Sequence, residues 1–157
     1  MPKEIKSEDL SLEVQQMIGS YSENIKTELE KAGQESIEYC NEEITKEANS
    51  QAGSRSWAKD FSWMKKEAGD WSDYIKHFKT KITEDRNGNK RYIWYVGGKK
   101  YRLTHLLEHS HALFIFGRPH GSTKAYPHIA PAAERTKEHY LKAVEEAIEK
   151  AGSETKE

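Results

Sequence analysis

The stretch Tyr101–Ala112, "YRLTHLLEHSHA", holds the side chains of this chain that most resemble a catalytic or metal-binding set. His105 and His109 are four residues apart, so on a helix both imidazoles lie on the same face. Glu108 directly precedes the second histidine, an order that resembles the inverse zinc motif H-x-x-E-H. Zinc in an enzyme needs a third protein ligand. The candidates for that ligand are His111, His120 and His128. The cluster of His105, Glu108 and His109 therefore permits a metal-dependent hydrolase.

The same stretch also permits a purely structural role. Leu103, Leu106 and Leu107 share one helical face and would pack the segment on a core. The histidines would then lie at the edge of that face, where they would be hydrogen-bonded structural residues. Thr104 is placed to cap the helix, because its hydroxyl oxygen can accept a hydrogen bond from a free backbone N–H.

No other segment carries a recognisable catalytic signature, since the chain has neither a G-x-S-x-G sequence nor a phosphate-binding loop. The single cysteine, Cys40, excludes an intramolecular disulfide framework. It falls on the apolar stripe of a predicted helix, as expected for a thiol packed in a core. No cofactor is therefore expected.

The composition is polar for a chain of 157 residues that must bury a core by itself, since 32% of residues are charged and 35% are hydrophobic. Either much of the chain is extended helix, or apolar surface is buried against another subunit. The 25 basic and 26 acidic residues nearly balance, so sequence-specific nucleic-acid binding is not expected. No apolar run follows the first residues or approaches the length of a membrane span, and we expect a chain made in the cytoplasm that has no membrane partner.

The first long element predicted is a helix from about Leu10 to Ala48, because its apolar residues recur every three or four positions. Gly19 and Gly33 lower the helix propensity and are possible kinks or breaks. The apolar stripe is about one residue wide per turn, which predicts a single partner face for this helix.

A short helix is predicted from about Ser56 to Ala68, with a break at Gly69 and then a strand in which Phe78, Thr80 and Ile82 alternate with polar residues. A second strand, about Tyr92–Val96, is apolar on both faces. Asn87-Gly88 between the strands predicts a hairpin with a type I′ turn, and its polar neighbours allow a longer loop.

The remaining chain predicts a strand at Leu113–Phe116, a loop at Gly117–Lys124 and a last helix with Pro131 in its first turn. The apolar face predicted for this helix consists of Tyr140, Leu141, Val144, Ile148 and Ala151. Gly152 is the predicted stop.

Two of these segments together resemble a family of small structural proteins of tailed bacteriophages, described as tail components of the head–tail joining or tail-completion type. The family pattern is roughly Y-x-L-T-H-L-L-E-x-G-H-A, then a glycine- and arginine-rich loop, then P-H-I-x-P-A and a helix. The matching residues are Tyr101, Leu103, Thr104, His105, Leu106, Leu107, Glu108, His111, Ala112, Pro127, His128, Ile129, Pro131 and Ala132. Ser110 replaces the usual glycine, and "LFIFGRPHGSTK" replaces a shorter loop. The strong part covers about the last third of the chain.

The resemblance implies an α+β fold, with a long N-terminal helix and a C-terminal helix packed on a small antiparallel sheet. It implies a structural role in the virion, as a ring subunit that meets other neck and tail proteins after assembly in the host cytoplasm. His105, Glu108 and His111 would make polar links that hold the loop after Ala112. The segment from Tyr126 to Pro131 would set the angle of the last helix.

We therefore expect an N-terminal helical arm over residues 1–50, an α+β tail-component domain over residues 51–152 and a disordered tail over residues 153–157. The leading hypothesis is a non-enzymatic virion protein of a phage or prophage. The metal-dependent hydrolase is the alternative, and a general helical interaction module is a third possibility.

Overall fold

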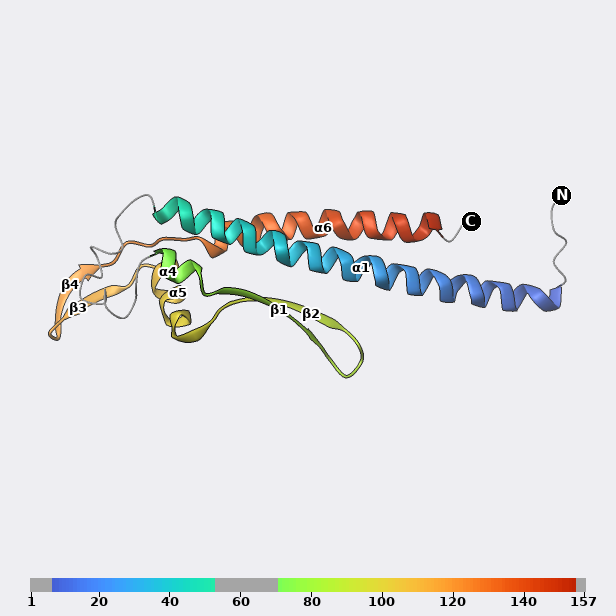
Figure 1. Cartoon of the computed structure of the whole chain (residues 1–157), viewed down its shortest axis with the longest axis horizontal. Coiled ribbons are helices and arrows are strands. Elements are labelled where there is room, and N and C mark those ends of the chain that lie inside the picture. Colours follow the sequence, from blue (N-terminus) through green and yellow to red (C-terminus); the bar gives the residue numbers. More distant parts are fainter. Residues whose placement is uncertain (1–6, 53–70, 155–157) are drawn as a thin grey trace.

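The computed structural model describes residues 7–52 and 71–154, which form an elongated α+β fold (Figure 1). Its elements in chain order are α1 (Ser7–Ala52), α4 (Trp71–Ile75), β1 (Phe78–Glu84), β2 (Lys90–Val96), η2 (Gly98–Lys100), α5 (Tyr101–Glu108), β3 (Ala112–Ile115), β4 (Arg118–Ser122) and α6 (Ile129–Glu154). The expected long N-terminal helix, C-terminal helix and antiparallel strands are confirmed. The strands form two separate two-stranded sheets, β1–β2 and β3–β4.

Helix α1 is continuous, so the breaks considered at Gly19 and Gly33 are wrong. At Gly33 the missing side chain serves packing instead. A Cβ atom there would lie 2.3 Å from a ring carbon of Tyr92, whose hydroxyl donates to the Glu30 carbonyl. Glycine therefore lets β2 approach the helix closely. No helix among the described residues is long and apolar enough to cross a membrane.

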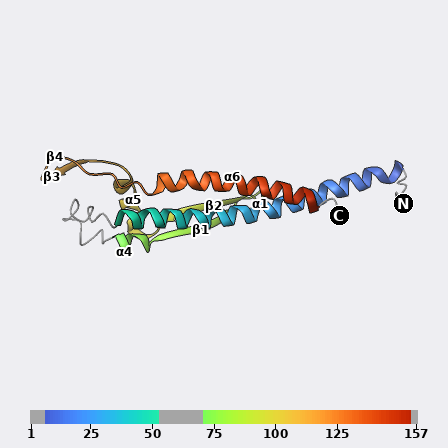
Figure 2. The ribbon, with the colours of Figure 1, turned by 90° about the horizontal axis from the view of Figure 1, so that it is seen from above.

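Helix α6 runs antiparallel to α1 and lies beside it in both views (Figures 1 and 2). It ends two residues beyond Gly152, and residues 155–157 lie outside the description. Its buried residues are Ala132, Ala147 and Ala151. The apolar face predicted for this helix is largely wrong, because Tyr140, Leu141 and Ile148 are 42% to 53% exposed. Small side chains face α1 because the two helices pack closely, and the bulky ones are left outside.

The first hairpin, β1–β2, pairs Phe78 with Val96 at one end and Glu84 with Lys90 at the other. The predicted type I′ turn is wrong, because of the two residues only Gly88 has a positive φ. The prediction of a longer loop is confirmed. Asp85 holds it by accepting hydrogen bonds from the backbone N–H groups of Asn87 (2.8 Å) and Asn89 (2.9 Å).

A second hairpin occupies the region predicted as strand and loop. Strand β4 lies inside the expected loop and pairs antiparallel with β3. Phe116 and Gly117 form its two-residue turn, and both have positive φ (51° and 75°), the requirement of a type I′ turn. The sequence signal was missed because phenylalanine seldom adopts this backbone conformation.

The core lies where α1, α4, α5, β2 and the segment before α6 meet. Its buried residues are Ala48, Trp71, Tyr74, Val96, Leu103, Leu107 and Tyr126. Leu103 and Leu107 are buried as predicted, whereas Leu106 is half-buried. A strand was expected after Gly69, but α4 precedes it because Trp71 and Tyr74, three residues apart, both face this core. The helix predicted over 56–68 and its break at Gly69 lie outside the described residues.

Candidate functional site

The carboxylate of Glu108, at the end of α5, caps the N-terminus of α6. It accepts hydrogen bonds from the backbone N–H groups of His128 (3.1 Å), Ile129 (3.1 Å) and Ala130 (2.8 Å). These N–H groups have no partner within the helix, and a negative charge is favourable at a helix N-terminus. The two sequence motifs, far apart in the chain, are thus joined by one side chain.

His128 is fully buried beside this cap. Its Nδ1 lies 2.9 Å from the Tyr126 carbonyl oxygen and 3.2 Å from the Glu108 carboxylate, so this nitrogen carries a hydrogen. Its Nε2 lies 3.0 Å from the Tyr74 hydroxyl, which is also 3.0 Å from the Thr104 hydroxyl. The Tyr74 hydroxyl thus lies between Nε2 of His128 and the Thr104 hydroxyl. The result is a polar chain from α5 through α4 to the start of α6.

Thr104 therefore does not cap α5, and this expectation is wrong. The 3-10 turn η2 leads directly into α5, which begins at Tyr101 with Lys100 as its cap residue and no side-chain cap. Because the helix starts three residues before Thr104, its hydroxyl lies inside the helix and meets Tyr74 instead.

The pKa values of this junction follow from burial and hydrogen bonding. Burial raises the pKa of Glu108, but the three N–H groups and His128 outweigh it, and the pKa lies below its usual value. Burial lowers the pKa of His128 despite the opposing effect of the Tyr126 carbonyl and Glu108. Burial raises the pKa of Tyr74 to about 12. At neutral pH the junction thus contains a carboxylate, a neutral imidazole and a neutral phenol.

The link between α5 and the second hairpin runs through residues 110 and 111. The Thr123 backbone N–H donates to the His111 carbonyl (2.8 Å), and the His111 N–H donates to the Thr123 hydroxyl (3.0 Å). Ser110 donates to the Thr123 carbonyl (2.8 Å). These bonds use the backbone groups of His111 and not its imidazole, so the predicted link through that side chain stays a prediction, whereas Glu108 holds α6 rather than the loop.

The three imidazoles of the opening motif do lie near one another. The ring centroid of His105 is 5.4 Å from that of His109 and 4.8 Å from that of His111. His111 Nε2 lies 3.2 Å from the His105 carbonyl oxygen, and Glu108 is held at α6. Within residues 7–52 and 71–154 no three His, Cys, Asp or Glu side chains converge as metal ligands.

The other motif residues lie around the junction. Tyr101 is exposed, Ile129 and Pro131 are half-buried, and the exposed Pro127 accepts a hydrogen bond from the Gln51 side chain through its carbonyl (3.5 Å). His120, considered as a ligand, is exposed on β4.

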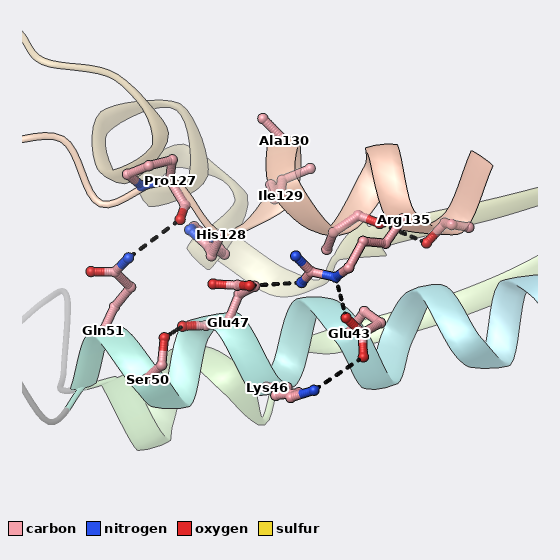
Figure 3. Close-up of polar contacts among 12 residues, drawn as sticks. Glu43, Lys46, Glu47, Ser50, Gln51, Pro127, His128, Ile129, Ala130 and Arg135 are labelled. Carbon is pink, nitrogen blue, oxygen red and sulfur yellow. Dashed lines mark hydrogen bonds and ion pairs between the residues drawn. The ribbon is translucent and has the colours of Figure 1, made fainter. Parts of the chain in front are cut away.

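The start of α6 is also tied to α1 by ion pairs that sequence reasoning missed. Figure 3 shows Arg135 of α6 between Glu43 and Glu47 of α1, with its Nη2 2.7 Å from Glu47. Tyr74 was likewise missed as a polar partner. No local signal marks these residues, because their partners are distant in sequence.

The arrangement holds the start of α6 in place, through one carboxylate, one buried imidazole and one guanidinium. Comparisons with family models, with curated proteins and with solved structures give no match to this chain.

Proposed function

We propose that this chain is a structural protein of a tailed bacteriophage or prophage, a head–tail joining or tail-completion component. It acts as a ring subunit at the junction of neck and tail, in contact with other neck and tail proteins. It assembles in the host cytoplasm and remains in the virion.

The proposal rests on the contacts of the motif side chains. Glu108 and His128, the residues best suited to chemistry, instead hold the start of α6 in place. Such bracing suits a subunit whose docking surfaces must keep a constant orientation. It agrees with the structural role that the resemblance of the two motifs implies.

The distribution of apolar surface supports an assembled state. At one end of the elongated subunit, the β3–β4 hairpin exposes Phe114 and the turn residue Phe116, whose side chain is 101% exposed. At the other end, the first turns of α1 expose Val14, Met17 and Ile18. Exposed apolar clusters of this kind are typical of protein–protein contacts. The near balance of charge suits a ring through which DNA passes without being retained.

The direct test is deletion of the gene in the phage or inducible prophage that carries it, followed by electron microscopy of the lysate. We expect heads and tails that are not joined, and a loss of infectious particles that the wild-type gene on a plasmid restores. A matched plasmid with Leu107→Asp, which disrupts the core, should not restore them. Intact and infectious particles from the deletion strain would overturn the proposal.

A further inference from the structure

The N-terminal part of α1 projects beyond the C-terminal end of α6 (Figure 1). We call residues 12–22 of this helix the overhang. Val14, Met17 and Ile18 recur at helical spacing on one side of it, and Ile18 is 63% exposed. At the seven-residue spacing of one helical face, the stripe continues from Ile18 through the half-buried Ile25 to the buried Ala32, which lies against Ala143 and Ala147 of α6. It is therefore the same packing face, extended past the end of its partner.

Within residues 7–52 and 71–154 no segment covers this stripe, since Val14, Met17 and Ile18 are 45%, 57% and 63% exposed. Helix α6, the partner of α1 further along, ends before it reaches the overhang (Figure 1). The stripe is therefore available to another molecule.

The charge of the overhang and its flanking residues indicates what kind of surface could bind it. Between Ser7 and Ile25 the sequence has four acidic residues and no lysine or arginine. Two overhangs paired with each other would place like charges together, which disfavours a symmetric contact. The partner surface should instead be an apolar groove with a basic rim.

The chain carries such a groove at the other half of α1. A cavity of about 530 Å³ lies between α1, β2 and α6, with Ile37, Cys40, Tyr92, Ala133 and Tyr140 among its lining residues. Lys90, Arg91 and Lys137 also line it. Lys90 pairs with Glu30, whereas Arg91 and Lys137 form no ion pair with any described residue. The exposed Tyr140 of α6 thereby becomes a wall of the groove.

The overhang cannot reach the groove of its own molecule. Helix α1 is continuous, and it contributes both the overhang and one wall of the groove further along. Gly33, at the near end of the groove, lies about 22 Å from Ile18 along α1. Any contact between the two surfaces is therefore intermolecular and joins different patches on the two copies. Repeated contacts of this kind close into rings when the rotation permits it.

We propose that the overhang of one copy occupies the groove of a second copy. Val14, Met17 and Ile18 pack against the groove wall, and Glu13, the acidic residue of the overhang, faces Arg91 and Lys137. The proposal deepens the ring role proposed above, because it names the contact between subunits. It makes its own prediction for the purified protein, which needs no virion.

The first test is sedimentation of purified, untagged protein up to about 1 mM. We expect association that Ile18→Asp weakens at least about thirtyfold, because it places a charge in the apolar contact. Lys137→Glu should weaken association about tenfold, and adding Glu13→Lys should restore most of it. Lys142→Glu, a charge reversal at an exposed α6 position outside the groove lining, is the control and should have no effect. Each variant is checked for an unchanged melting temperature.

The second test joins carboxylates to amines with a carbodiimide in a mixture of isotope-labelled and unlabelled protein. A cross-link between Glu13 and Lys137 that combines both isotopes supports the proposal. A protein that stays monomeric at about 1 mM, or that associates equally well with Ile18→Asp, overturns it. If the deletion phage assembles normally while these cross-links form, the virion role fails and the contact stands. If the deletion phage fails to assemble but no such cross-links form, the proposed contact fails and the virion role stands.

Discussion

The backbone N–H of Ala130 donates a 2.8 Å hydrogen bond to the carboxylate of Glu108, 22 residues earlier in the chain. This bond and its two neighbours place the first turn of α6 on the end of α5. The remaining length of α6 then follows α1, so the cap determines where the long helical pair begins.

Replacement of Glu108 by alanine should therefore destabilise the protein. Three N–H groups lose their acceptor, and we expect a loss of about 2 kcal/mol in the free energy of unfolding, measured with urea. Glu108→Gln keeps one acceptor oxygen without the charge and should lose less. Glu138→Ala, exposed in the same helix, is the control and should change stability by less than about 0.5 kcal/mol. Equal effects of Glu108→Ala and Glu138→Ala would contradict the capping role.

The stability of the protein should fall on mild acidification because of His128. Since folding lowers the pKa of His128, the unfolded chain takes up this proton at a higher pH than the folded protein. Stability should then fall as the pH drops through 6.5, the ordinary value for this group. Neither Glu108, whose pKa is lowered from 4.5, nor Tyr74, at about 12, titrates in this range.

The measurement is the urea midpoint between about pH 7.5 and about pH 5.5. His128→Gln should reduce the slope of the midpoint against pH, even though the variant is less stable at every pH. His120→Gln, at an exposed position, should keep the wild-type slope. An unchanged slope in His128→Gln would show that this imidazole does not titrate differently on folding.

Gly33 and Gly19 should respond in opposite directions to the same substitution. Gly33→Ala places a methyl group 2.3 Å from the Tyr92 ring, and we expect a loss of about 1–3 kcal/mol. Gly19 has no atom within 4 Å of the same position, so Gly19→Ala should stabilise the helix by up to about 1 kcal/mol. Thermal unfolding of both variants tests this. Stabilisation by Gly33→Ala would mean that Tyr92 does not pack closely on α1.

Phe116 should matter for assembly and not for folding. Its backbone is in the left-handed region and its side chain is fully exposed, so Phe116→Asn should leave stability unchanged or raise it by about 0.5–1 kcal/mol. In the deletion phage, the same variant should restore fewer infectious particles than the wild-type gene. Lys142→Ala provides the matched surface control. Full restoration by Phe116→Asn would exclude the hairpin tip as a contact.

The purified, untagged protein should contain no stoichiometric zinc after treatment with a chelator and exposure to zinc. The reason is that Glu108 is held at α6 and His111 lies against the His105 carbonyl, which leaves two neighbouring imidazoles. Elemental analysis with His109→Ala as the comparison decides the point. If the wild-type protein held one equivalent of zinc and the His109→Ala variant held none, the metal-dependent hydrolase hypothesis would be favoured.

The sequence by itself determined the elements whose signals are local. The three- and four-residue spacing of apolar residues sufficed for α1 and α6, and alternation with a polar turn sufficed for β1 and β2. Leu103 and Leu107 were identified as core residues for the same reason. These patterns reflect the geometry of the backbone, so a short window of sequence contains them.

Only the tertiary structure decided which groups meet. The close approach of α1 and α6 selected alanine for the buried face and left Tyr140, Leu141 and Ile148 outside. Glu108 stands next to His109 in the sequence, yet its strongest partners are the free N–H groups of a helix that starts 21 residues later. Which partner a charged or apolar side chain meets depends on all the groups that the fold brings near it. Most of those groups are distant in the sequence, so the spacing of neighbouring residues cannot predict the partner.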